Sequence, residues 1–537
     1  MGGHSCTAIA DSTKNNKHTG YLINRLREFS PTVNMVFNQH GSAAINDYLE
    51  RIIPEPIDAY QSSQDLYKVV YDLIKPLLGK KIAKQASEDI AAQPFVLTAN
   101  HHGVDFFAQS VQGTIIFGLK HKAAENAAGN DSQTTIPVFA CGNIPLNNLT
   151  YPRGILVYSL PTFSVDNIPA KIPIFPDRLK RKMVSRVERF DHSMVERTLQ
   201  HIHKMTKKRE MSAEVSDTLT EILTNEYASE DILSFDSYSE QAVVLNNRLW
   251  RRMFTHSEVP ELVYLEIEKI VAELLAFDLQ NDNSLFRLLM FDPKILQKML
   301  RELEGVRVCW RRDNLTRRML DGDPRRINAN NCGTCFFWGI DEQGMRVPLL
   351  CIPEEKGKNK LTGLDDKGKQ YEFSLNPDAL IAALKKEQIL PSLFTCYTVL
   401  SLARGIVCAG GYYQAEYLPK VQHGVANALA VCSEYQEVAQ KIRYVPTKTY
   451  LSGMQTVMCR GHNDLLIPAG PIETIVGGGL SASDMEKIKK LSVREAHIAS
   501  LFDTIEDLPL DTPWGKHQKQ ELADECGQIL KDSIVIK

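Results

Sequence analysis

The sequence predicts an α/β protein in which a mixed sheet core is combined with a large helical complement and a small antiparallel β element. Three observations support this fold class. Short apolar runs at residues 95–99, 136–140 and 155–160 each end in polar, turn-forming residues, as buried strands do. Other long segments repeat apolar residues at helical spacing. Residues 305–375 instead alternate apolar and polar side chains between turn signals.

Four stretches are predicted to be helical. Residues 20–78 carry apolar side chains at helical spacing around a pair of prolines. Residues 177–224 are basic and helical, which is typical of a solvated helix face. Residues 239–304 form the longest helical pattern. Residues 393–413, the most apolar long segment, are interpreted as a buried helix because an arginine and several glycines interrupt them, which a membrane span would not favour.

Two hairpins are predicted within the alternating region. Residues 336–340 lead through a turn at 341–344 into 347–352, and residues 361–373 turn at 366–368. Both turns contain glycine and charged residues between apolar runs. They predict an antiparallel β element.

The composition shifts predict five regions along the chain. These are a flexible lead and helical cap at 1–80, an α/β catalytic core at 81–240, a helical segment at 241–304, the antiparallel β element at 305–375, and a mainly helical part at 376–537 that completes the pocket.

Composition limits the class of protein. The 537 residues have a formal net charge of −3, with 43% hydrophobic and 24% charged residues, which is ordinary for a soluble globular protein. This balance favours neither nucleic acid nor membrane insertion. Eleven cysteines, an odd number without a visible secretory signal, predict a cytoplasmic location. A homo-oligomer remains open.

A cluster of polar and titratable side chains follows the first predicted strand, in the sequence Asn100-His101-His102-Gly103-Val104-Asp105. Polar groups at the carboxyl end of a strand occupy the place where α/β folds put their sites. Imidazole exchanges protons near neutral pH, and a carboxylate can fix its tautomer. We therefore predict that His101 or His102 is a general base and that Asp105 orients it.

The spacing His101-x-x-x-Asp105 resembles the HxxxD element of coenzyme A-dependent acyltransferases of the plant BAHD type and of peptide-synthetase condensation domains. In those families the histidine deprotonates the acceptor hydroxyl or amine, and the aspartate is structural. The resemblance covers five residues, and Phe106 stands where the families place glycine. Their downstream DFGWG is reduced here to Phe336-Phe337-Trp338-Gly339. The Asn-His pair is also similar to the start of glycerolipid acyltransferase motifs, with the aspartate one residue closer. No family is assigned.

A metal site is the competing interpretation of the same residues. Two imidazoles and the Asp105 carboxylate suit zinc or iron, with an open position for water or substrate. Adjacent residues of an extended segment face opposite sides, so a tight turn at Gly103 would be needed. His423 or His462 would supply a further ligand.

A second group of residues is predicted to hold an anionic substrate, since arginine forks bind carboxylate and phosphate and amides donate to developing negative charge. The predicted substrate-binding residues are Asn100, Asn143, Arg153, Arg311, Arg312, Arg404, Gln414, His423 and His462. Internal ion pairs with interleaved aspartates are the alternative for residues 311–326.

The lone pair Cys332 and Cys335 is interpreted as two buried or loosely redox-active thiols, with a zinc knuckle that includes Cys309 and Cys351 as the alternative. The sequence thus predicts a group-transfer enzyme, most simply an acyltransferase, acting on a small anionic metabolite. The acyl donor would be a thioester such as one of coenzyme A. The alternatives are a metal-dependent enzyme and a non-enzymatic ligand-binding or scaffold protein.

Overall fold

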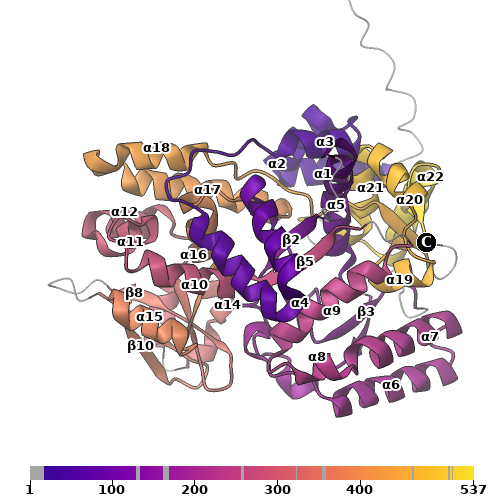
Figure 1. Ribbon diagram of the computed structural model, residues 1–537, viewed down its shortest axis with the longest axis horizontal. Helices are drawn as coiled ribbons and strands as arrows, with labels where there is room; N and C mark the ends of the chain where they lie inside the picture. The colour runs from indigo at the N-terminus through magenta and orange to yellow at the C-terminus, as the bar shows by residue number, and fades with distance from the viewer. Residues whose placement is uncertain are drawn as a thin grey trace, which may run out of the picture.

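The computed structural model describes residues 17–128, 134–160, 169–255, 259–321, 323–352, 359–461, 465–505, 508–510 and 512–537. A four-stranded sheet lies at its centre (Figure 1), in the order β12-β1-β2-β5 with every neighbouring pair parallel. Its strands are β1 (Phe95–Leu97), β2 (Thr135–Ala140), β5 (Glu261–Glu266) and β12 (Val407–Ala409).

The two faces of this sheet belong to two hydrophobic cores. Leu97 and Tyr264 pack into one core with helices α5 and α9, whereas the residues just before them, Val96 and Val263, pack into the other with α4 and α10. This alternation follows from the two-residue period of a strand. The helices are α4 (Gln64–Ala92), α5 (Ala108–Ala128), α9 (Tyr238–Arg252) and α10 (Ile267–Asp278).

The α/β class with a large helical complement is confirmed, and its parallel strands are short apolar runs because both of their faces are buried. Two helix predictions are wrong in part. Residues 261–266 form β5 between two true helices, whose apolar repeats conceal it in the sequence. The segment 393–413 contains α16 (Leu393–Tyr397), the π-helix η6 (Thr398–Ala403) and strand β12 instead of one helix.

The antiparallel strands lie in small sheets outside the central one. β3 (Gly154–Val157) pairs with β4 (Ala170–Pro173). Both predicted hairpins are confirmed, as β6 with β7 and β9 with β10. The strands of this region are β6 (Phe337–Ile340), β7 (Arg346–Pro348), β8 (Leu350–Ile352), β9 (Lys360–Leu364), β10 (Gln370–Ser374) and β11 (Ile389–Pro391).

Helices from the two ends of the described chain lie side by side in Figure 1. The Glu525 carboxylate of α22 accepts hydrogen bonds from the backbone N–H groups of His18 and Thr19 in the first turn of α1. The elements concerned are α1 (Lys17–Phe29), α2 (Pro31–His40), α3 (Ile45–Ile52), α19 (Pro471–Val476), α20 (Ala482–Lys490), α21 (Val493–Thr504) and α22 (Lys516–Leu530).

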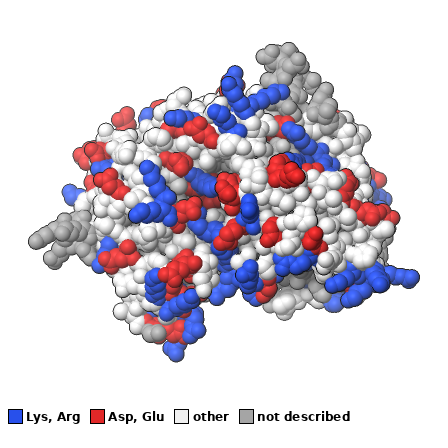
Figure 2. Space-filling model, turned by 60° about the horizontal axis from the view of Figure 1, so that its bottom comes forward, with Lys and Arg blue, Asp and Glu red and all other residues white. Residues whose placement is uncertain are grey.

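The remaining elements surround this framework. They are η1 (Asp177–Leu179), η2 (Val184–Arg186), α6 (His192–Lys207), α7 (Ala213–Ile222), η3 (Leu223–Tyr227), α8 (Glu230–Ser234), α11 (Leu285–Phe291), α12 (Pro293–Glu302), α13 (Arg312–Leu320), η4 (Pro324–Arg326), α14 (Ala329–Cys332), α15 (Pro377–Lys385), α17 (Tyr412–Leu429), η7 (Ser433–Tyr435), α18 (Gln436–Tyr444), β13 (Val457–Arg460), β14 (Leu466–Pro468) and β15 (Val535–Ile536). Acidic and basic side chains intermingle over most of the face seen in Figure 2. Among the described helices, none has the length and apolar character that crossing a membrane requires.

Candidate active site

The candidate site is built where β1 and β2 end. Beyond the strands the two segments remain paired: Cys141 N–H donates to the Asn100 carbonyl at 2.9 Å, and His102 N–H donates to the Cys141 carbonyl at 2.8 Å. His101 and Cys141 form a parallel bridge. The backbone is therefore extended through the two histidines, and their side chains face opposite sides.

His101 is partly buried and lines a cavity of about 380 Å³, which we name the His101 cavity. Much of the cavity wall is apolar or aromatic, including Phe29, Phe107, Tyr397 and Tyr413. None of the described residues that line it is an aspartate or a glutamate. The cavity thus presents an imidazole to an organic molecule without a competing carboxylate.

A chain of hydrogen bonds fixes the tautomer of His101. Asn148 Nδ2 donates to the Pro145 carbonyl at 2.5 Å, so Asn148 Oδ1 is the acceptor that faces Thr150. The Thr150 hydroxyl donates to this oxygen at 2.7 Å and lies 3.1 Å from His101 Nδ1. Since the hydroxyl proton is already used, Thr150 Oγ1 accepts from Nδ1–H. In the neutral ring the lone pair is then on Nε2.

The neutral form of His101 is favoured at neutral pH. Burial lowers the pKa of His101, the interaction with Asn148 opposes the shift, and the positive charge of Arg346 adds to it. An imidazole with a lowered pKa and a defined lone pair has the properties of a general base.

His102 lies on the other side of the segment and is fully buried. Its Nε2 is 2.9 Å from the Ser239 hydroxyl, which donates to Glu266 at 2.8 Å. Burial lowers the pKa of His102 to about 4, against the opposing negative charge of Glu266. Ser239 and Glu266 also line a separate cavity of about 260 Å³ on that side. His102 itself does not line the His101 cavity, so its contacts favour a structural role.

Asp105 does not take the orienting role that the sequence predicted. Its carboxylate accepts hydrogen bonds from Asn100 Nδ2 at 3.0 Å, from the Ser110 hydroxyl at 2.7 Å and from the Tyr264 hydroxyl at 3.2 Å. Burial raises the pKa of Asp105, and these donors oppose the shift. Among the described contacts of Asp105 there is none to an imidazole, and Thr150 occupies the position at His101 Nδ1 instead.

Helix α9 holds the turn between the histidines and Asp105. Asn246 accepts from Asp105 N–H at 2.8 Å and donates to the Gly103 carbonyl at 2.9 Å. The Tyr238 hydroxyl accepts from Val104 N–H at 3.0 Å. Gly103 has φ +115°, and a Cβ there would stand 2.5 Å from Pro152 Cβ, so the turn requires glycine.

A second cavity, of about 470 Å³, adjoins the first, since Arg307, Val308 and Leu393 line both. We name it the arginine cavity because Arg307, Arg311 and Arg346 line it. Its lining includes three asparagines but, among the described residues, no carboxylate. The fork of Arg346 is held by the Asn143 carbonyl, 2.7 Å from Nη1, and by Asn330 Oδ1.

Asn143 links this cavity to the sheet. Its backbone N–H donates to Glu268 at 3.2 Å, and Gly142 N–H donates to the same carboxylate at 2.8 Å. Burial, with the neighbouring charge of Glu266, raises the pKa of Glu268 to about 8. Asn143 is 3% exposed, and its Nδ2 has no hydrogen-bond partner among the described residues. Asn100 Nδ2, the other predicted amide donor, is occupied by Asp105.

Several predicted anion-binding arginines are occupied by internal partners instead. Arg404 is 2% exposed and binds Asp65 and Asp278, at 2.6 and 2.7 Å from Nη2. Arg153 donates to the Phe175 carbonyl at 2.9 Å and pairs with Asp177 at 3.2 Å. Neither residue is among the described residues that line the two cavities, and both charges are paired within the fold.

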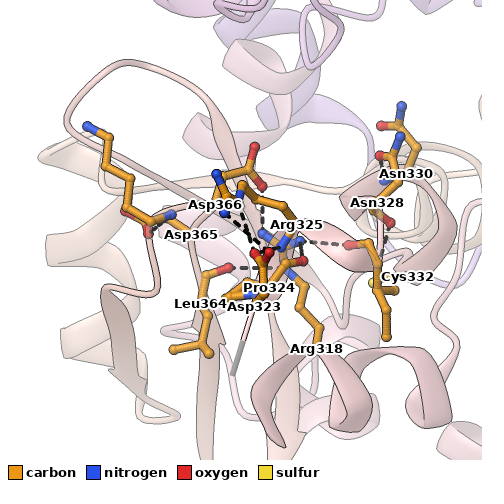
Figure 3. A network of polar contacts seen from close by, with 12 residues as sticks. Arg318, Asp323, Pro324, Arg325, Asn328, Asn330, Cys332, Leu364, Asp365 and Asp366 are labelled. Carbon is orange, nitrogen blue, oxygen red and sulfur yellow. Dashed lines mark hydrogen bonds and ion pairs between the residues drawn. The ribbon is translucent and has the colours of Figure 1, made fainter. Parts of the chain in front are cut away.

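The 311–326 arginines divide into two groups. Arg318 is buried and pairs with Asp366, and Arg325 pairs with Asp323, as Figure 3 shows. Arg311 lines the arginine cavity, whereas Arg312 is exposed and lies outside its lining. The predicted pairing with interleaved aspartates therefore holds for Arg325, and for Arg326 with Asp321, whereas the partner of Arg318 lies outside the segment.

The remaining predicted residues are spread over the molecule. Gln414 lines the His101 cavity, but its amide already donates to Thr98 and Cys408 and accepts from Tyr397. His423 is exposed on α17 and lines neither cavity. His462 lies outside the described residues.

The predicted metal donors do not converge. His101 faces its cavity, His102 faces Ser239, and Asp105 is surrounded by donors. In the described part of the chain no group of three or more His, Cys, Asp or Glu side chains is placed to hold a metal ion. The residues present at this turn therefore do not fit a metal centre. Cys332 and Cys335 are buried thiols.

Four side chains that shape the site were not predicted: Asn148, Thr150, Arg307 and Arg346. Asn148 and Thr150 lie in the polar turn after β2, where an Asx motif is a recognisable signal. Arg346 begins a hairpin strand and carries no local signal for a site. Comparisons with protein-family models, with curated proteins and with solved structures found no match for this chain.

Proposed function

We propose that this protein is a group-transfer enzyme, and most simply an acyltransferase, that acts on a small anionic metabolite with His101 as general base. The observation that carries the proposal is the Asn148–Thr150–His101 chain, which leaves the Nε2 lone pair in the ring that lines the cavity. The arginine cavity beside it supports an anionic substrate.

In this proposal His101 Nε2 takes the proton of an acceptor hydroxyl or amine as that atom attacks the carbonyl carbon of an acyl thioester. Collapse of the tetrahedral intermediate breaks the carbon–sulfur bond, and the leaving thiolate receives the proton from the His101 imidazolium. Asn143 Nδ2 is the available amide donor for the developing oxyanion, since Asn100 Nδ2 is occupied.

The test compares His101→Ala with His102→Gln. Each purified protein is incubated with a metabolite extract supplemented with acyl thioesters, and mass spectrometry follows compounds consumed and formed. We expect the wild type and His102→Gln to convert the same compounds, and His101→Ala to be slower by about 10²- to 10⁴-fold. Wild-type rates in His101→Ala, or no conversion by the wild type, would contradict the proposal.

The pH profile provides a second readout. Because the pKa of His101 is lowered, its base form persists below the ordinary value of 6.5. Activity should therefore fall on the acid side only as the pH drops through this lowered pKa. A profile centred above 6.5 would indicate a different base.

A further inference from the structure

Three guanidinium groups, those of Arg307, Arg311 and Arg346, line the arginine cavity. Among the described residues, Arg307, Arg311 and Arg346 form no ion pair, and no carboxylate lines the cavity. Arg346 is half-buried, whereas Arg307 and Arg311 are exposed, so three positive charges line one cavity that has no carboxylate among its described lining residues. The cavity therefore has a positive charge that the fold does not neutralise.

The neighbouring outer cavity shares Arg346 and Asn330 with the arginine cavity, and its lining also includes Lys180, Arg181, Arg325 and the carboxylates of Asp341 and Asp366. Arg181 pairs there with Asp366, while Arg325 pairs with Asp323 and Lys180 with Asp177 at 3.0 Å. Lys180, Arg181 and Arg325 thus pair with carboxylates, whereas Arg307, Arg311 and the shared Arg346 form no ion pair among the described residues. This difference identifies a site for an anion.

Two of the three guanidinium groups, those of Arg307 and Arg346, are held in position by aromatic rings. Arg346 stacks over Trp338 with 4.6 Å between the guanidinium carbon and the ring centroid, and Arg307 stacks over Tyr413 at 3.9 Å. Stacking uses the face of a guanidinium and leaves N–H groups at its edge for an acceptor. Val308, next to Arg307, has φ +69°, a conformation that a β-branched residue rarely adopts. Strain of this kind persists where the surroundings impose it, which is common at ligand sites.

We propose that the arginine cavity binds the phosphate of a phosphate monoester whose apolar part lies in the His101 cavity. A phosphate dianion matches several converging arginines better than a single carboxylate does. The common wall of Arg307, Val308 and Leu393 places the aromatic cavity directly beside the phosphate position. This inference deepens the proposed function, on which it rests for the chemistry at His101, by naming the substrate class.

Calorimetry on the full-length protein tests the inference with four probes: hexyl phosphate, inorganic phosphate, hexanoate and hexanol. We expect hexyl phosphate to bind at least tenfold more tightly than each of the other three. Arg307→Gln and Arg311→Gln should each weaken hexyl phosphate about tenfold, as expected for loss of a charge-assisted hydrogen bond. Both side chains are exposed, so these variants should fold.

Arg325→Gln is the matched control, because Arg325 is exposed and already paired with Asp323. Its affinity for hexyl phosphate should equal that of the wild type. Equal affinity in Arg307→Gln and Arg311→Gln would overturn the inference, as would equal binding of hexanoate or the absence of hexyl phosphate binding. Calorimetry measures binding alone, whereas turnover of the His101→Ala variant measures the general base, so failure of the general-base proposal and failure of the phosphate site give different results.

Discussion

Histidine and arginine side chains occur both on the cavity side of the sheet edge and in the buried core behind it, but their partners differ. On the cavity side, His101 lines a cavity, and Arg307 and Arg346 have no acidic partner among the described residues. In the core, His102 is bound to Ser239, and Arg404 is bound to two aspartates. Hydrogen-bond and ion-pair partners, more than residue type, therefore distinguish the histidine and arginines that line the cavities from those in the buried core.

The largest stability difference should separate two arginines. Arg404→Met leaves Asp278, whose side chain is 3% exposed, without its cation, and we expect a loss of about 3–5 kcal/mol in the free energy of unfolding. Arg307→Met, in the cavity, should change it by less than about 0.5 kcal/mol, since no ion pair is broken. Chemical denaturation of both variants measures this. Similar losses of unfolding free energy in the two variants would show that pairing with aspartates does not distinguish Arg404 from Arg307.

The buried histidine should make the fold sensitive to acid. The pKa of His102 is lowered to about 4, so the unfolded chain, with the ordinary value of 6.5, binds the proton more readily. The stability contributed by neutral His102 is present above pH 6.5 and is lost as the pH falls from 6.5 towards 4. At 1.36 kcal/mol per pKa unit, the loss is about 3 kcal/mol.

His102→Gln removes this titration and keeps an N–H group for Ser239. Between pH 7 and pH 4 the variant should therefore lose about 3 kcal/mol less free energy of unfolding than the wild type. His497, also buried with its pKa lowered to about 4, remains in both proteins and serves as an internal reference. Parallel pH curves for variant and wild type would show that His102 is not the acid-labile group.

Much of the framework was predictable because it depends on local patterns. The runs that form β1 and β2 and the turns of the two hairpins carry their signals within a few residues. Placing an imidazole at the end of β1 followed from the same patterns. Strand β5 was missed because helical repeats flank it, and propensity is overridden when the core needs a strand.

The partners within the site could not be predicted, because they come from distant segments. Arg346 reaches Asn143 from a hairpin that is far away in sequence, and Arg404 meets Asp65 and Asp278 from two different helices. Whether an arginine is neutralised is a property of the folded chain. The predicted anion-binding arginines therefore included Arg311, which lines the arginine cavity, but also Arg404 and Arg153, which the fold pairs internally.

A smaller effect should follow from loss of the hydroxyl that fixes the His101 tautomer. Thr150→Val keeps the side-chain shape but removes the acceptor for Nδ1–H, so turnover should fall about tenfold, the value of one hydrogen bond. Thr150→Ser restores a hydroxyl and should regain most of the activity. The profiling assay with acyl thioesters measures both variants. Equal rates in Thr150→Val and the wild type would show that Thr150 does not position the base.

The smallest expected effect concerns the strained residue shared by both cavities. A left-handed conformation costs a β-branched residue about 1–2 kcal/mol, and Val308→Gly relieves this, although added freedom in the unfolded chain offsets about 0.5–1 kcal/mol. Stability should thus stay level or rise by up to about 1 kcal/mol, while the affinity for hexyl phosphate falls a few-fold because Arg307 is held less firmly. Val306→Gly, in the same cavity wall but without a positive φ, should only destabilise. If Val308→Gly instead lowered stability as much as Val306→Gly, backbone strain at Val308 would have no part in positioning Arg307. The difference between the cavity and the core would then depend on charge pairing alone.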